Sequence, residues 1–253
     1  MEKIHINFSS IPIASNILAQ MIRAAYVEAV SESGSEVVAS EELSRRIDGV
    51  AKWATNADRQ KNGLMLHGET PGTGKTTMAV ALYRIVADFP ARKTALIERI
   101  RASAVQYEYK GQTAQAERIW AEIEALIALR WDAPPVVFLT AREISSIAEN
   151  GGRAALLEDE GSPAKIPLLF IDDLGDEPGE VHYYGKSPDG QFYNSKIAPL
   201  VEVLLYRYEN RLPVIITTNF GTDGIRAKYG PRIEDRLREM CEGGYFSGKS
   251  YRK

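Results

Sequence analysis

The fold is decided by one stretch of the sequence, Leu64-Met65-Leu66-His67-Gly68-Glu69-Thr70-Pro71-Gly72-Thr73-Gly74-Lys75-Thr76-Thr77. Its first residues are apolar and few enough for a strand, and a helical apolar pattern follows its last threonine. Glycines between a strand and a helix allow the backbone N–H groups of the loop to turn inward, where a Cβ would obstruct an anion. We therefore expect a phosphate-binding loop that joins a strand to a helix.

The residues after the glycines indicate which phosphates this loop binds. The following helix directs its N-terminal dipole and free N–H groups at an anion. Lys75 can reach β- and γ-phosphates, and the Thr76 hydroxyl can ligate Mg²⁺. We expect ATP with magnesium as the ligand, bound by Thr70, Pro71, Gly72, Thr73, Gly74, Lys75, Thr76 and Thr77.

The first turn of the loop departs from the pattern G-x-x-x-x-G-K-[ST]. That pattern requires a glycine at position 69, where this chain has Glu69, and Gly68 comes one residue early. Either Glu69 takes the glycine position or the loop is one residue longer. The Gly-x-Gly-Lys-Thr segment is unaffected.

Further short apolar runs predict the rest of a sheet. They occupy residues 135–139, 168–171 and 214–216, and helical patterns separate them. We expect a last strand between Tyr245 and Tyr251. Continuous apolar runs are typical of strands buried on both faces, so the fold class is α/β with a parallel sheet between helices.

Two of these strands end in polar side chains. The run 166–171 leads into Asp172 and Asp173, and the run 213–218 leads into Asn219. Ligands of parallel α/β sheets bind at the carboxyl ends of the strands. We expect Asp172 near the Mg²⁺ that Thr76 holds, Asp173 positioned to orient or deprotonate the attacking water, and Asn219 near that water or the γ-phosphate.

Two helical segments lie outside this pattern. Residues 1–60 predict a short N-terminal module with one helix within 11–31 and another that begins after Ser40. Residues 94–131 predict a helical hairpin broken near Gly111. The hairpin either adds core packing or docks a partner through Tyr107, Tyr109 or Trp120.

Composition places limits on the function. The 253 residues carry a net charge of −3, which gives no global sign of nucleic-acid binding. Charge is nevertheless uneven: Asp172 to Glu180 is acidic, whereas residues 211–253 hold nine Lys and Arg against five Asp and Glu. These stretches are either solvated surface or, for the basic one, an edge that faces phosphates of ATP or DNA.

Three features that the sequence lacks indicate the cellular compartment of the protein. Cys241 is the single cysteine, so no internal disulfide framework exists. No apolar run approaches the ~18 residues that a membrane span needs, and residues 1–5 lack the pattern of a secretory signal. We expect a cytoplasmic protein with no membrane partner.

Four motifs in order make the sequence resemble a known family. After the phosphate loop come Phe-Ile-Asp-Asp-Leu-Gly at 170–175, Ile-Ile-Thr-Thr-Asn at 215–219 and Tyr-Gly-Pro-Arg-Ile-Glu-Asp-Arg-Leu-Arg at 229–238, with Gly-Lys-Ser-Tyr-Arg at 248–252 near the end. Together these resemble the AAA+ ATPases of the DnaC/IstB type, which are bacterial helicase loaders and transposition helper ATPases. The resemblance covers roughly residues 45–253; relative to it, the hairpin at 94–131 looks like an insertion and the loop between Asp176 and Lys196 is long.

The resemblance implies a P-loop core of 61–253 with strand order 5-1-4-3-2 and no C-terminal lid. Lys75 and Thr76 match the Walker A residues, Asp172 and Asp173 the Walker B acids, and Asn219 the polar sensor. Arg232 matches the arginine finger that one subunit inserts into its neighbour's ATP site, and Arg236 looks like a second nucleotide- or neighbour-contacting arginine. From spacing alone, both arginines could equally pair with Glu234, Asp235 or Glu239.

Three functions remain open. The first is a Mg-dependent ATPase that loads a replicative helicase, with residues 1–60 as the helicase grip, single-stranded DNA as a further partner, and self-assembly or docking on a related ATPase through Arg232. The second is an IstB-like transposition helper on duplex DNA. The third is an ATP-gated scaffold with negligible turnover, although the presence of both Asp172 and Asp173 argues against it.

Overall fold

The computed structural model describes residues 13–37, 39–56, 61–129, 131, 133–186, 192–248 and 250. Residues 1–12, and with them the start of the expected N-terminal module, lie outside this range, as do residues 249 and 251–252 of the C-terminal motif. The chain forms two compact units. The sheet unit holds β1, the loop after it, the first turn of α3 and everything from β2 onward; the helical unit holds α1, α2, the rest of α3, α4 and α5.

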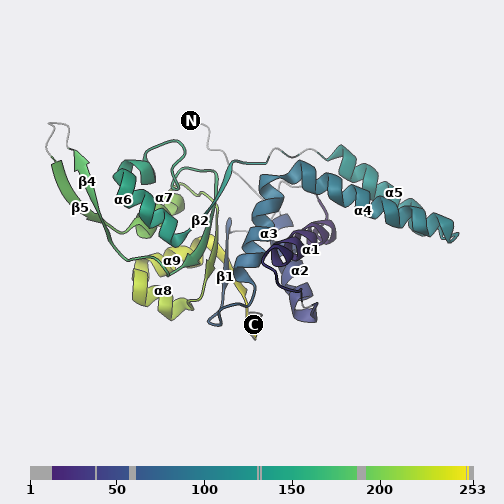
Figure 1. Cartoon of the computed structure of the whole chain (residues 1–253), viewed down its shortest axis with the longest axis horizontal. Helices are drawn as coiled ribbons and strands as arrows, with labels where there is room; N and C mark the ends of the chain where they lie inside the picture. The colour runs from purple at the N-terminus through teal and green to yellow at the C-terminus, as the bar shows by residue number, and fades with distance from the viewer. Residues whose placement is uncertain are drawn as a thin grey trace. The chain divides into compact units, whose positions relative to one another are not determined.

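A five-stranded parallel sheet forms the centre of the sheet unit (Figure 1). Its strands are β1 (Gly63–His67), β2 (Val136–Thr140), β3 (Leu168–Leu174), β6 (Val214–Thr218) and β7 (Cys241–Tyr245), in the order β2-β3-β6-β1-β7. Each adjacent pair is parallel. Counting these five strands along the chain gives the order 5-1-4-3-2, so the predicted fold class and strand order are confirmed.

Both faces of the central strands β3 and β6 are buried, as their continuous apolar runs predict. Leu169 and Ile171 of β3 point into a core built with α6 (Ala141–Leu157), α7 (Pro199–Glu209), α8 (Thr222–Tyr229) and α9 (Pro231–Met240). Phe170, on the opposite face of β3, is fully buried too. Thr140 begins α6 with a capping box, in which its hydroxyl accepts the Glu143 N–H and the Glu143 carboxylate accepts the Thr140 N–H.

Two expectations about strands were wrong. The last strand of the sheet is Cys241–Tyr245, and the expected stretch from Tyr245 onward begins where this strand ends. Cys241 is buried in the core, as a small apolar residue would be. The expected long loop after Asp176 instead contains β4 (Val181–Lys186) and β5 (Phe192–Ile197), an antiparallel pair with β4 beside α6 (Figure 1).

The helical unit contains the two helices and the hairpin that the sequence predicts. α1 spans Ser15–Glu32 and α2 spans Glu41–Thr55, and the Ser40 hydroxyl caps α2 by accepting the Leu43 N–H at 3.1 Å. α4 (Phe89–Tyr109) and α5 (Thr113–Ala128) pack against each other as the hairpin. The hairpin belongs to the same compact unit as α1 and α2, and Arg92 of α4 forms an ion pair with Glu28 of α1. Within the described residues, no helix has the length and hydropathy to cross a bilayer.

Arg207 on α7 links the segments that lead into the neighbouring strands β3 and β6. Its side chain is 0% exposed. The guanidinium donates to the carbonyls of Pro163, Ala164, Ile166 and Pro167, which lead into β3, at 2.8 to 3.3 Å, and to that of Pro213 at the start of β6. Burial lowers the pKa of Arg207 to about 9, so the side chain still carries its charge at neutral pH.

Replacing Arg207 with Met should lower the free energy of unfolding by about 3 kcal/mol, because several buried carbonyls lose their donor. Chemical denaturation followed by circular dichroism measures the loss. Arg238→Met is the control, because Arg238 is exposed and its surface ion pair is screened by solvent. Equal stability of the two variants would show that Arg207 does not hold the strands.

Candidate functional site

The loop between β1 and α3 (Lys75–Ala87) has the conformation that its glycines predict. Gly72 and Gly74 have φ of 77° and 91°, in the left-handed region that favours glycine. Thr73 between them is 1% exposed, and its hydroxyl donates to the Thr70 carbonyl at 3.3 Å. The loop therefore folds back on itself and leads directly into the N-terminus of α3.

Gly68 supplies the glycine that the first turn of the loop requires. Its φ is 157°, and a Cβ there would lie 2.3 Å from the carbonyl oxygen of Phe246, which no real side chain tolerates. Glu69 is exposed and has no positive φ. The structure thus favours the longer of the two loops that the sequence left open.

Lys75 places its ammonium group at the centre of this loop. Its side chain is 5% exposed and donates to the carbonyls of Gly68 and Thr70 at 2.8 and 3.0 Å, and contacts the Thr73 hydroxyl at 3.4 Å. A buried ammonium group at the centre of a phosphate loop favours an anionic ligand, because an opposite charge offsets the cost of desolvation.

The magnesium pair that the sequence predicts is assembled. Thr76 at the start of α3 donates to Asp172 Oδ1 at 2.9 Å, although the two residues are 96 positions apart. Both are hard oxygen donors, which suit Mg²⁺. No group of three or more His, Cys, Asp or Glu that could hold a metal occurs in the described part of the chain, so a metal here would need further ligands from nucleotide or water.

Thr217 is a residue of this site that the sequence analysis missed. It lies on β6, which separates β1 from β3 in the sheet. Its hydroxyl donates to Asp172 Oδ1 at 2.5 Å and accepts the Asp173 N–H at 2.9 Å. Thr217 therefore fixes both acidic residues; its place two residues before Asn219 was the available signal.

Asp173 has an uncommon backbone conformation. Its φ is 54°, and among described non-glycine residues it shares a positive φ only with Arg211. Aspartate tolerates the left-handed region better than most residues, at a cost of order 1 kcal/mol. The conformation turns the chain where β3 loses register with β6, and the half-buried Asp173 side chain stands next to Asp172 at the carboxyl end of the strand.

Asn219 lies at the same edge of the sheet. It follows Thr218, the last residue of β6, which pairs with His67, the last residue of β1 before Gly68. Thr218 also donates to the Leu174 carbonyl at 2.7 Å, which joins the ends of β6 and β3. The structure therefore brings Asn219 to the end of the strand between the loop and the acidic residues.

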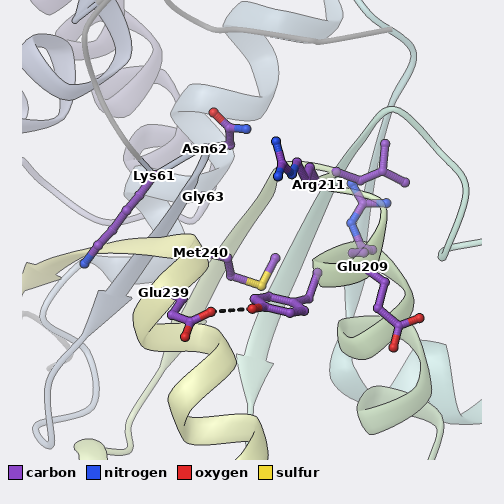
Figure 2. Close-up of a pocket in the computed structure, with 10 residues that line it drawn as sticks. Lys61, Asn62, Gly63, Glu209, Arg211, Glu239 and Met240 are labelled. Atoms are coloured by element: carbon purple, nitrogen blue, oxygen red, sulfur yellow. Dashed lines mark hydrogen bonds between the residues drawn. The ribbon is translucent and has the colours of Figure 1, made fainter. Parts of the chain in front are cut away.

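The two candidate arginines on α9 differ. Arg236 lies 4.5 Å above the ring of Tyr208 and pairs with Asp235 and Glu239, which matches the salt-bridging alternative. The Tyr208 hydroxyl also donates to Glu239, and this hydrogen bond is the dashed line that ends at Glu239 in Figure 2. Arg232 is exposed, and within the described residues no ion pair or hydrogen bond involves it.

A cavity of about 530 Å³ lies at the opposite edge of the sheet, where β1 begins and where α7 and α9 end (Figure 2). Its lining includes three cations, Lys61, Arg207 and Arg211. Cations at helix C-termini balance the negative end of the helix dipole. Arg207 and Arg211 lie at the C-terminal end of α7, so the fold explains their presence, and the cavity lies at the edge of the sheet opposite the phosphate loop.

Comparisons with known proteins give distant likenesses. No family model and no curated protein sequence matches the chain. Among solved structures, the DnaC helicase loader is 20% identical, with a TM-score of 0.44, and the match covers 88% of this chain and 98% of that chain. DnaI is 17% identical, with a TM-score of 0.45, and the match covers 97% of this chain and 99% of that chain. AMPPCP-bound DnaA from Aquifex aeolicus is 13% identical, with a TM-score of 0.44, and the match covers 85% of this chain and 50% of that chain. At TM-scores below 0.5 these likenesses do not identify a function, which must be argued from the site.

Proposed function

We propose that this chain is an AAA+ ATPase that binds and hydrolyses ATP with Mg²⁺ and acts in DNA replication as a DnaC-like helicase loader in the cytoplasm. The observation that carries the ATPase proposal is the 2.9 Å contact between Thr76 and Asp172. It joins the end of a phosphate loop to the acidic end of a buried strand, the combination that places a metal beside nucleotide phosphates.

The residues of the site divide the chemistry among them. Backbone N–H groups of 70–77 and Lys75 bind and orient the phosphates. Thr76 and Asp172 would hold Mg²⁺, which when bound neutralises charge on the β- and γ-phosphates. Asp173 accepts a proton from the attacking water, and Asn219 orients that water. Arg232, exposed on α9, is available to a neighbouring subunit's site, where a guanidinium would stabilise transition-state charge.

The loader role rests on the order of the sequence motifs, and a replicative helicase and single-stranded DNA are its proposed partners. Residues 1–60, which contribute α1 and α2 to the helical unit, are the proposed helicase grip. Transposition with duplex DNA is the alternative for the same motifs, and the identity of the partner separates the two.

Hydrolysis is tested with two carboxylates that lie three residues apart, Asp173 near the end of β3 and Asp176 just after it. Asp173→Asn should lower the ATP turnover rate ~10²–10⁴-fold, because the base is lost, while ATP affinity stays near native. Asp176→Asn is the matched control and should keep native turnover, because Asp176 is exposed and paired with Arg142. Phosphate release, with and without single-stranded DNA, measures turnover. Native turnover no higher than that of Lys75→Ala under both conditions would favour the ATP-gated scaffold.

The helicase grip is tested by surface substitutions. Deleting residues 1–60 would also remove the packing of α1 on α4 and the partner of Arg92. We choose Val27→Glu instead, because Val27 on α1 is 42% exposed. It should weaken the ATP-dependent complex with the purified hexameric helicase ~10-fold, measured by biolayer interferometry.

Val105→Glu on α4 is the matched control, because Val105 is 52% exposed in the same unit. It should leave the affinity for the helicase unchanged. The reverse pattern would assign docking to the α4–α5 hairpin, and loss in neither variant would remove both helical surfaces from the proposal.

A further inference from the structure

A buried carboxylate lies in the loop after β3, and α8 holds it. The Glu177 side chain is 1% exposed. It accepts hydrogen bonds from the Tyr229 hydroxyl and from the Gly175 N–H, the latter at 2.9 Å. The Lys228 ammonium lies 3.3 Å from Glu177 Oε1 and donates to the carbonyls of Gly175 and Glu177 at 2.5 and 2.7 Å. We call Glu177, Lys228 and Tyr229 the loop clamp.

The loop clamp is unlike the ion pairs elsewhere on α8 and α9. The pair of Arg238 and Asp235, for example, is exposed on both sides, and such pairs contribute little to stability. A carboxylate as buried as Glu177 is costly to desolvate unless cations and hydrogen-bond donors surround it, and here one ammonium, one hydroxyl and one N–H do so. Burial, together with the hydrogen bond to Glu177, raises the pKa of Tyr229, so its hydroxyl keeps its proton and remains a donor.

On one side, the loop clamp fixes the segment that follows the acidic residues. Gly175 is two residues after Asp173 and is bonded through both its N–H and its carbonyl. It has a φ of 111°, and a Cβ there would lie 2.7 Å from the ring of Phe220, the residue after Asn219. The clamp therefore holds the loop that follows Asp173, close to the segment that carries Asn219.

On the other side, the loop clamp fixes the turn that carries Arg232. Lys228 and Tyr229 are the last residues of α8, Gly230 turns the chain with a φ of 84°, and α9 begins at Pro231. Arg232 is thus three residues from Tyr229. Neighbouring arginines on α8 and α9 are held by acids: Arg226 by Glu234, and Arg236 and Arg238 by Asp235.

Within the described residues Arg232 has no such side-chain partner, so the direction in which it projects depends on how the turn is held. We propose that the loop clamp positions Arg232 for catalysis, by joining the loop after β3 to the α8–α9 turn as one rigid piece. Glu177, Lys228 and Tyr229 are then positioning residues. This inference rests on the proposed ATPase function and on Arg232 as its arginine finger. Glu177, the buried acid of the loop after β3, thereby has a role in that reaction, because it helps to fix the position of Arg232.

Tyr229→Phe tests the inference, because it removes one hydroxyl from the loop clamp and keeps the ring. It should lower the maximal ATP turnover rate by roughly tenfold, since small misplacements of catalytic groups cost one to two orders of magnitude. The dissociation constant for ATP should stay near native. Tyr208→Phe is the matched control: it also removes a hydroxyl bonded to a glutamate, here Glu239 near the other end of α9, and should keep native turnover.

A double-mutant cycle separates positioning from general stabilisation. Arg232→Ala should lower turnover ~10³-fold or more. If Tyr229 acts through Arg232, adding Tyr229→Phe to Arg232→Ala should lower turnover no further. The inference would be overturned if the double variant lost turnover by the product of the two single losses. It would also be overturned if Tyr208→Phe lowered turnover tenfold as well. Failure of the proposed function itself looks different: the native protein would then turn over no faster than Lys75→Ala.

Discussion

The contact between the Thr76 hydroxyl and the Asp172 carboxylate is the interaction on which the candidate site depends. Thr76 lies at the start of α3, which follows β1 through the phosphate loop, and Asp172 lies on β3; in the sheet, β6 separates β1 from β3. The contact therefore exists only if the sheet has this strand order and this register. Thr217 bridges the intervening strand by bonding to the same carboxylate oxygen. The chemistry of the site therefore depends directly on the strand order and register of the sheet.

Much of this arrangement could be predicted from the sequence. Glycines at 72 and 74, an apolar strand before them and a helix after them leave few alternatives for the loop, and the runs before Asp172 and Asn219 mark buried parallel strands. The last strand was misplaced because Cys241–Tyr245 contains Gly243 and Gly244, which have low strand propensity, whereas the aromatic residues after them suggested a strand. The β4–β5 pair was missed because antiparallel pairing outside the main sheet leaves no buried apolar run.

Other features depend on tertiary contacts that sequence patterns do not carry. Glu177 falls in an acidic stretch that is typical of solvated surface, yet the end of α8 buries it. Arg207 reads as an ordinary helical arginine, yet it binds the carbonyls before β3 and β6. Arg232 and Arg236 both have acidic residues within three positions in the sequence, and only the contacts in the fold show that Arg236 is the one that is held. Buried charges are set by the surroundings that neutralise them, and those surroundings come from distant parts of the chain.

The central claim is that Thr76 and Asp172 hold magnesium together with bound nucleotide. Calorimetric titration of the protein with ATP, in magnesium and in EDTA, tests it most directly. The account predicts that magnesium tightens ATP binding to the native protein and that Asp172→Asn, which keeps an oxygen toward Thr76 and Thr217 but loses the charge, removes most of that gain. An equal magnesium-dependent gain in the native protein and in Asp172→Asn would contradict it.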